Sequence, residues 1–137
     1  MYHVLIPVDG SVERATAQAN AVVDLPHAND SVEATMLHVF DDEDTAEKTN
    51  VEQTAAGKEM TKILRDAGVK VESISRYGDP EEQIVSVADQ YEVDTIILGG
   101  RKRSPLGALV FGSVSQAVIL DSDIPVTVTG GAVEQPA

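Results

Sequence analysis

Cysteine is absent from the 137 residues of this sequence, which narrows the chemistry open to the chain. Its absence excludes disulfide bonds, thiolate metal sites and cysteine catalysis, and it is typical of a cytoplasmic protein. The three histidines, His3, His27 and His38, are too widely spaced to form a metal-ligand pattern. No apolar run approaches the ~18 residues that span a membrane, and the N-terminus has no basic, cleavable leader. We therefore expect a cytoplasmic protein without membrane association.

Basic residues are scarce: 10 Lys and Arg stand against 23 Asp and Glu, for a formal net charge of -13. A nucleic-acid-binding domain normally presents a basic face, so binding to DNA or RNA is not expected. A high-salt cytoplasm favours such acidity, because salt screens the repulsion and hydrated carboxylates maintain solubility. We therefore interpret the composition as halophilic. The length predicts one domain, at 1–130, followed by a flexible tail at 131–137.

Apolar, β-branched runs alternate with helical patterns along the chain. Strands are expected at 4–8, 32–40, 69–76, 95–98 and 125–129. Helices are expected after the N-cap Ser11, at 51–67 up to Gly68, from Asp79-Pro80 onward, and at 112–121, whereas 41–50 is expected to be a loop. The alternation predicts a single-domain α/β fold with a doubly wound, five-stranded parallel sheet, flavodoxin- or Rossmann-like, in the order 3-2-1-4-5.

In that order the carboxyl ends of strands one and four lie side by side, where such sheets bind ligands. An acid there, Asp9, can accept hydrogen bonds from ribose hydroxyls or hold a metal. Gly112-Ser113 opens a helix and offers backbone N–H groups to a phosphate, and Ser115 adds a hydroxyl. The triplet 101–103, Arg-Lys-Arg, is the one dense basic cluster. Together these signals favour a nucleotide or another phosphorylated ligand.

Each signal also has an ordinary structural explanation. Asp9 is a common type of turn or N-cap residue, and the basic triplet could be a solvated turn on an acidic surface. The acidic run 41–44 could ligate Mg²⁺, but charge runs on loops are usually solvated, so no metal site is predicted. No general base or nucleophile is identified. The chain is therefore not predicted to be an enzyme.

Five stretches, in order along the chain, resemble the universal stress protein family: PVDGS at 7–11, LHV at 37–39, GDP at 78–80, Gly99 with GSVSQAV at 112–118, and IPVTV at 124–128. The resemblance implies a five-stranded parallel sheet between helices, usually assembled as a homodimer. It also implies that some members bind ATP through a motif G-x-x-G-x9-G-[ST], whereas members without the motif do not.

Carried over to this sequence, the resemblance implies that Asp9 contacts ribose and the backbone near Val39 contacts adenine. It implies that the glycines and Ser113 hold phosphates. The cofactor expected is ATP, with or without Mg²⁺. The expected binding residues are Pro7, Val8, Asp9, Val39, Gly99, Gly100, Arg101, Lys102, Gly112, Ser113 and Val114.

Lys102 stands where the motif has its second glycine, although the spacing to Gly112-Ser113 is intact. The Lys102 side chain either blocks a close backbone approach to the ligand or pairs its charge with a phosphate. We favour nucleotide binding that is retained but weakened or altered.

The function expected is a stress-response domain that binds an adenine nucleotide. The alternative is a nucleotide-independent, dimeric interaction module, and a third hypothesis is slow ATP hydrolysis, which would need Mg²⁺ and a positioned water. Strand 125–129 (Pro125 to Thr129) alternates Val and Thr and should lie at a sheet edge, so we expect a homodimer across it.

Overall fold

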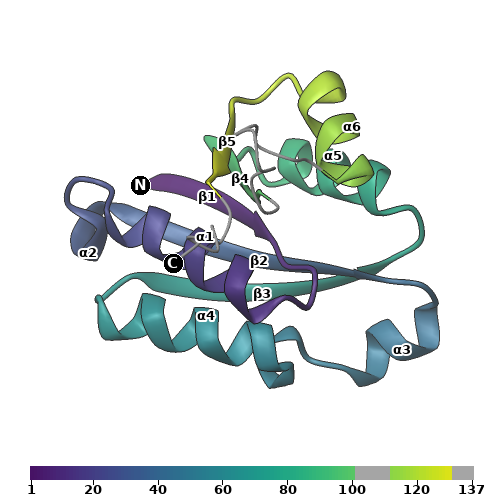
Figure 1. The fold of residues 1–137 in the computed structure, drawn as a ribbon, viewed down its shortest axis with the longest axis horizontal. Coiled ribbons are helices and arrows are strands. Elements are labelled where there is room, and N and C mark those ends of the chain that lie inside the picture. Colours follow the sequence, from purple (N-terminus) through teal and green to yellow (C-terminus); the bar gives the residue numbers. More distant parts are fainter. Residues whose placement is uncertain (101–111, 131–137) are drawn as a thin grey trace, which may run out of the picture.

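The computed structural model describes residues 1–100 and 112–130, and Figure 1 shows how their helices and strands are arranged. The strands are β1 (Tyr2–Pro7), β2 (Val32–Phe40), β3 (Lys70–Tyr77), β4 (Thr95–Gly99) and β5 (Val126–Thr129). The helices are α1 (Val12–Val23), α2 (Ala28–Ser31), α3 (Glu43–Lys48), the 3-10 turn η1 (Val51–Gln53), α4 (Ala55–Asp66), α5 (Pro80–Gln90) and α6 (Ser113–Asp121). The tail predicted at 131–137 lies outside the described residues.

The strands form one parallel sheet in the order β3-β2-β1-β4-β5, which confirms the predicted topology. Strand β1 pairs with β2 along its whole length, from Tyr2 to Pro7. Its pairing with β4 is much shorter, because only Val4 and Leu5 have partners there. Beyond Leu5 the two central strands separate, at the point where the strand order reverses, and this opening positions the site described below.

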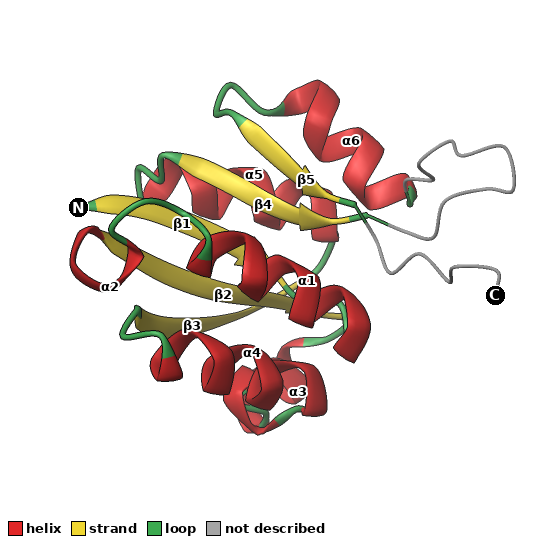
Figure 2. Ribbon diagram, turned by 60° about the vertical axis from the view of Figure 1, so that its left-hand side comes forward, coloured by secondary structure: helices red, strands yellow, loops and turns green. Residues whose placement is uncertain are grey.

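Alternate residues of the central strands enter two different cores. Val4 and Ile6 of β1 pack with Met36 of β2 under α1 and α4. Leu5 and its neighbours on the opposite face pack under α5 and α6. Figure 2 shows the sheet between these two pairs of helices, so the doubly wound arrangement is confirmed.

Local side-chain chemistry sets several helix boundaries as predicted. The Ser11 side chain accepts a hydrogen bond from the Arg14 amide at the start of α1. Asp79 does the same for the Glu82 amide, with Pro80 at the first position of α5. Gly68 follows α4 with φ +78°, a conformation that favours glycine.

The prediction of a loop at 41–50 was wrong, because Glu43–Lys48 forms α3. The helix has no buried residue and therefore no apolar stripe that would have signalled it. Its start is held by Asp42, whose carboxylate accepts a hydrogen bond from the Thr45 amide; this bond lowers the pKa of Asp42. A Lys48–Asp44 ion pair of 3.1 Å spans one helical turn.

The continuous helix predicted at 51–67 is broken at Thr54. The Thr54 hydroxyl accepts a hydrogen bond from the Gly57 amide and donates one to the Val51 carbonyl, so it caps α4 and anchors η1. A Cβ on Gly57 would lie 1.8 Å from the Val51 carbonyl oxygen, so the turn and the helix can pack this closely only at a glycine. The short helix α2 was not predicted at all.

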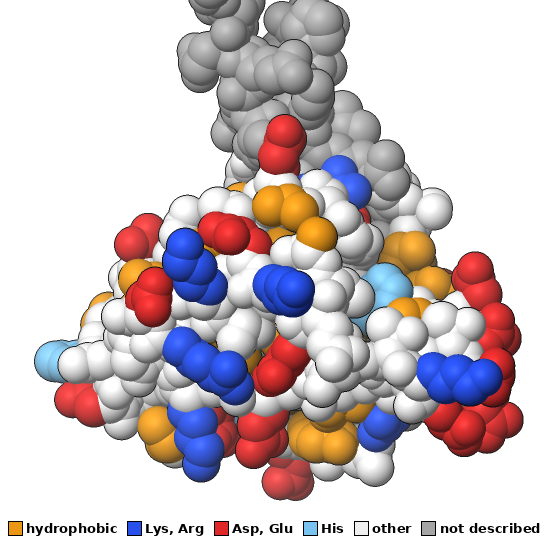
Figure 3. All heavy atoms as spheres, turned by 90° about the horizontal axis from the view of Figure 1, so that it is seen from below, with side chains coloured by type: hydrophobic (Ala, Val, Ile, Leu, Met, Phe, Trp, Pro, Cys, Tyr) orange, Lys and Arg blue, Asp and Glu red, His pale blue; other side chains and the backbone are white. Residues whose placement is uncertain are grey.

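Figure 3 views the molecule from the side of α4 and α3 and shows acidic side chains gathered over α3. Lys and Arg side chains are scattered over the rest of that face, with carboxylates between them. Over 1–100 and 112–130, no helix is long and apolar enough to cross a membrane.

Candidate functional site

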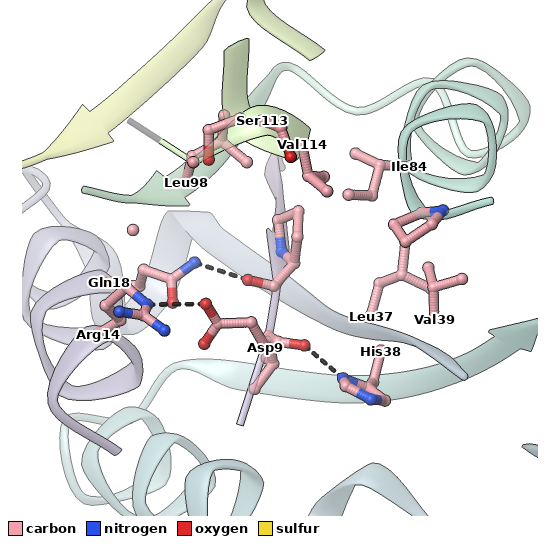
Figure 4. Close-up of a pocket in the computed structure, with 16 residues that line it drawn as sticks. Asp9, Arg14, Gln18, Leu37, His38, Val39, Ile84, Leu98, Ser113 and Val114 are labelled. Carbon is pink, nitrogen blue, oxygen red and sulfur yellow. Dashed lines mark hydrogen bonds and ion pairs between the residues drawn. The ribbon is translucent and has the colours of Figure 1, made fainter. Parts of the chain in front are cut away.

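A cavity of about 220 Å³ opens where β1 and β4 separate, at the carboxyl ends of the central strands. The ends of β1, β2 and β4 and the N-terminal portions of α1, α5 and α6 supply its walls (Figure 4). Segments from both halves of the chain therefore meet in one pocket.

Gln18 holds the two diverging strands at the base of the pocket. Its side chain is 2% exposed. Its amide nitrogen donates hydrogen bonds to the carbonyl oxygens of Pro7, at 2.7 Å, and Ile97, at 2.9 Å. These carbonyls belong to β1 and β4 beyond the last pair that the two strands form with each other. One side chain thus satisfies both strand ends and keeps the pocket open between them.

Asp9 follows β1 and lies on the wall of the pocket. One carboxylate oxygen accepts a hydrogen bond from the Ser11 amide at 3.0 Å. The other accepts a hydrogen bond from Nε of Arg14 at 2.7 Å, within an ion pair. The Asp9 side chain is 56% exposed, so a ligand in the pocket can reach it.

The Arg14 side chain passes over Gly99 at the end of β4. A Cβ on Gly99 would lie 3.0 Å from Cβ of Arg14 and 3.3 Å from its Cγ and Cδ, which is tighter than ordinary van der Waals contact. Glycine at 99 therefore gives Arg14 room to reach Asp9 across the gap between the strands.

His38 orders the loop that follows β1. Its Nδ1 is hydrogen-bonded to the Val8 carbonyl oxygen, so Nδ1 carries the proton and donates. The ring also packs edge-on against Phe40, with the ring centroids 4.4 Å apart. This environment indicates a packed, hydrogen-bonded histidine that shapes the pocket wall.

The pocket has an apolar side and a polar side. In Figure 4, Leu37, Val39 and Ile84 lie at one side of the cavity, while Arg14 and Gln18 lie at the other with Asp9 between them. Such a division suits a ligand with a flat apolar ring system and a polar or charged remainder.

Helix α6 begins at the pocket, and among the described residues no side chain at its N-cap accepts a hydrogen bond from the helix. Its N-cap is Gly112, which offers no side chain for a hydrogen bond, whereas side chains cap α1, α3, α4 and α5. No acidic residue occupies its first turn. Ser113 and Ser115 line the pocket beside these amides. This end of the cavity therefore offers N–H and hydroxyl donors to an anion.

The structure brings most of the predicted binding residues together. The pocket is lined by Pro7, Val8, Asp9, Val39, Gly99, Gly112, Ser113 and Val114. Gly100 is placed elsewhere: its amide donates to the Thr129 carbonyl at 3.1 Å and continues the β4–β5 ladder. Arg101 and Lys102 lie outside the described residues, as does Gly107.

Sequence reasoning missed further lining residues, which are Arg14, Gln18, Leu37, His38, Pro80, Ile84 and Leu98. A signal for two of them was present. Arg14 and Gln18 are four residues apart on the helix that starts at Asp9-Gly10-Ser11, so they share a face. A glutamine within the stripe Ala15, Ala19 and Val22 also marks a buried polar group that needs partners.

The part of the chain that the structure describes contains no group of three or more His, Asp or Glu that could hold a metal ion. Within 1–100 and 112–130, the acidic side chains of α3 are exposed, and Asp44 pairs with Lys48.

Fold and pocket together define a doubly wound α/β protein with a cavity at its topological switch point. A model of the universal stress protein family matches residues 1–130. The chain belongs to this family.

One curated relative, a universal stress protein of Methanocaldococcus jannaschii, is 41% identical over 69 residues, which are 50% of this chain and 43% of that protein. The chain thus spans less than half of that relative's length. The solved structure of a universal stress protein from Archaeoglobus fulgidus matches with a TM-score of 0.73 and 26% identity, covering 94% of this chain and 98% of that one.

Two more distant solved structures carry adenine nucleotides. A universal stress protein from Archaeoglobus fulgidus in complex with dAMP has a TM-score of 0.66 and 22% identity, covering 94% of this chain and 98% of that one. A family protein from Arabidopsis thaliana with AMP bound has a TM-score of 0.70 and 17% identity, covering 99% and 93%. At these identities the likeness establishes the shared fold.

Proposed function

We propose that this protein is a stress-response domain that binds an adenine nucleotide in the pocket between β1 and β4. The base occupies the apolar side, near Val39 and Ile84, and the ribose lies against Asp9. The phosphates lie at the start of α6, beside Gly112 and Ser113. The proposal assigns binding and not turnover.

The proposal rests on one arrangement. A single cavity is lined by apolar side chains, by the exposed carboxylate of Asp9 and by the start of α6, whose N-cap Gly112 has no side chain to cap the helix. A nucleotide presents a flat ring, a sugar with one or two hydroxyl groups and an anion in that order, and each matches one of these surfaces. The dAMP and AMP complexes of other family members support the choice of an adenine nucleotide.

The proposal of ATP as the particular adenine nucleotide depends on the sequence motif G-x-x-G-x9-G-[ST]. Gly99, Gly112 and Ser113 match its positions and lie in the pocket. Lys102 replaces its second glycine, and we propose that binding is retained with altered strength. Because the described residues offer no cluster of metal ligands, Mg²⁺ would be held through the nucleotide phosphates.

Calorimetric titration of the full chain with ATP, in the presence and absence of Mg²⁺, and with AMP tests the proposal. The Asp9→Ala variant should bind AMP about tenfold more weakly, because a charged hydrogen-bond acceptor for the ribose is lost. Asp89→Ala removes the same charge from an exposed site on α5, outside the pocket, and should leave the affinity unchanged. Equal affinity of the Asp9 and Asp89 variants would remove Asp9 from the site.

The alternative function, a dimeric interaction module independent of nucleotide, gains support from the sheet edge. β5 is the last strand of the sheet. The carbonyls of Pro125 and Thr129 face β4, so by alternation the backbone polar groups of Val126 and Val128 face away from the sheet. We propose that a second copy pairs with this edge.

Light scattering coupled to size exclusion, with and without AMP, tests this pairing. Wild-type protein should form a dimer, and Val128→Pro, which removes an outward N–H group, should form a monomer with an unchanged circular dichroism spectrum. Wild-type protein that is monomeric at high concentration would refute the pairing. A stable dimer that binds no nucleotide would favour the interaction module.

A further inference from the structure

Arg14 is the one Lys or Arg among the described residues that line the pocket. The chain carries a formal net charge of -13, so an anionic ligand approaches against the overall charge of the protein. A guanidinium inside the cavity is therefore the strongest local attraction that the described residues offer to a phosphate.

The Arg14 side chain is held by Asp9. Only Nε of the guanidinium takes part in this contact, at 2.7 Å from the carboxylate. Within 1–100 and 112–130, the two terminal nitrogens of Arg14 have no hydrogen-bond partner, and the side chain is 28% exposed. The guanidinium can therefore turn toward a ligand without breaking any further contact of the described residues.

The same contact occupies Asp9. Its two carboxylate oxygens accept hydrogen bonds from the Ser11 amide and from Arg14. A ribose hydroxyl that binds Asp9 must share or displace the Arg14 contact, because the Ser11 amide is fixed in the backbone turn. A ligand that offers nothing to Arg14 in return thus competes with the ion pair.

We infer that Arg14 is a phosphate-binding residue that is exchanged from Asp9 to the ligand, and that this exchange selects nucleotides over unphosphorylated nucleosides. The inference rests on the proposed nucleotide site. A nucleoside monophosphate replaces the Asp9–Arg14 pair with two new contacts, ribose to Asp9 and phosphate to Arg14. A nucleoside supplies only the first and leaves the guanidinium without its partner.

Titration calorimetry with AMP and adenosine on wild-type protein, Arg14→Gln and Arg14→Lys tests the exchange. Arg14→Gln should weaken AMP binding about tenfold or more, since a charge-assisted hydrogen bond is lost. The same variant should bind adenosine as tightly as wild type or more tightly, because Asp9 is released. Arg14→Lys keeps the charge and should recover part of the AMP affinity.

Arg65→Gln is the matched control. Arg65 on α4 forms an ion pair of 3.4 Å with Glu52 of η1. Its side chain is 58% exposed and lies outside the pocket. Arg65→Gln changes the net charge of the protein by the same amount as Arg14→Gln. Any effect of overall charge on binding therefore appears in both variants, whereas the loss of a local contact appears only in Arg14→Gln. Arg65→Gln should leave the affinity for uncharged adenosine unchanged and lower that for AMP only slightly, because the overall field acts on the phosphate alone.

The opposite response of the two ligands distinguishes phosphate binding from a structural role. If Arg14→Gln weakens AMP and adenosine by the same factor, Arg14 only shapes the pocket and the inference is wrong. Unchanged AMP affinity in Arg14→Gln also overturns it while leaving the proposed function intact. If wild-type protein binds neither AMP nor ATP, the proposed function itself fails, and the inference fails with it.

Discussion

The amide nitrogen of Gln18 lies 2.7 Å from the carbonyl oxygen of Pro7 and donates a hydrogen bond to it. A second bond to Ile97 joins the ends of β1 and β4 through the same atom. The pocket thus depends on one buried side chain, which donates hydrogen bonds to carbonyl groups of β1 and β4 at the point where these strands no longer pair with each other.

Replacement of Gln18 by methionine keeps the side-chain length but removes both donors. The carbonyls of Pro7 and Ile97 would lose their partners at a buried position, and we expect the free energy of unfolding to fall by about 1–3 kcal/mol. Urea denaturation measures this change. Gln90→Met, at an exposed site at the end of α5, is the control and should have little effect. A Gln18 variant as stable as the wild type would show that the bridge contributes nothing to stability.

Substitution of Gly99 by alanine should displace Arg14, because the added Cβ would lie 3.0 Å from Cβ of that residue. We expect a loss of stability of about 1–3 kcal/mol, typical of overpacking. The double variant Gly99→Ala/Arg14→Ala removes the contacts of the new Cβ with Cγ and Cδ of Arg14 and keeps only the one with its Cβ, so it should recover part of the loss. Denaturant unfolding of the four proteins in the cycle gives the coupling. Additive effects would mean that the two side chains do not interact.

A carboxyl pair between α5 and α6 predicts a pH-dependent stability. The side-chain hydrogen bond with Asp121 raises the pKa of Glu81 above its ordinary value, and the neighbouring negative charges act in the same direction. The folded state therefore binds this proton more tightly than the unfolded chain does. The resulting stabilisation is fully present below the ordinary pKa of Glu81 and is lost as the pH rises through the raised value.

Glu81→Gln can donate the same hydrogen bond at every pH. At neutral pH the melting temperature of this variant should exceed that of the wild type, and the difference should shrink on acidification. Glu59→Gln on α4 removes an equal charge away from Asp121 and serves as the control. A constant difference across the pH range would argue against a shared proton.

The acidic composition predicts a response to salt. With a formal net charge of -13, repulsion among carboxylates opposes the folded state, and added salt screens it. The melting temperature should rise as KCl is increased from ordinary buffer toward molar concentration, and an equal molarity of sucrose should not reproduce the rise. A flat response above ordinary buffer salt would contradict the halophilic interpretation.

Most of the fold could be predicted because its signals are local. Ser11 and Asp79 mark helix starts by their side-chain chemistry, and β-branched runs mark the central strands. Strand order followed from the known preferences of alternating α/β chains. Helix α3 could not be predicted in the same way, since an exposed helix of charged residues has no apolar period.

The site was predictable only in part, for a related reason. Asp9, Gly99 and Gly112 follow from their places at strand and helix ends. Arg14 shares a helix face with Gln18, but its place over Gly99 depends on the separation of β1 from β4, which the sequence does not predict. Its role depends on tertiary contacts between segments far apart in the chain.

The most direct test of the central claim is a titration of isotope-labelled protein with AMP, followed by nuclear magnetic resonance. At 14.5 kDa the chain suits this method, which observes both backbone amides and the Nε–H of Arg14. The account predicts saturable shifts at Asp9, Val39, Gly99 and Ser113, together with a large change at Nε of Arg14 as it leaves Asp9. Absence of shifts, or shifts confined to residues outside the pocket, would contradict it.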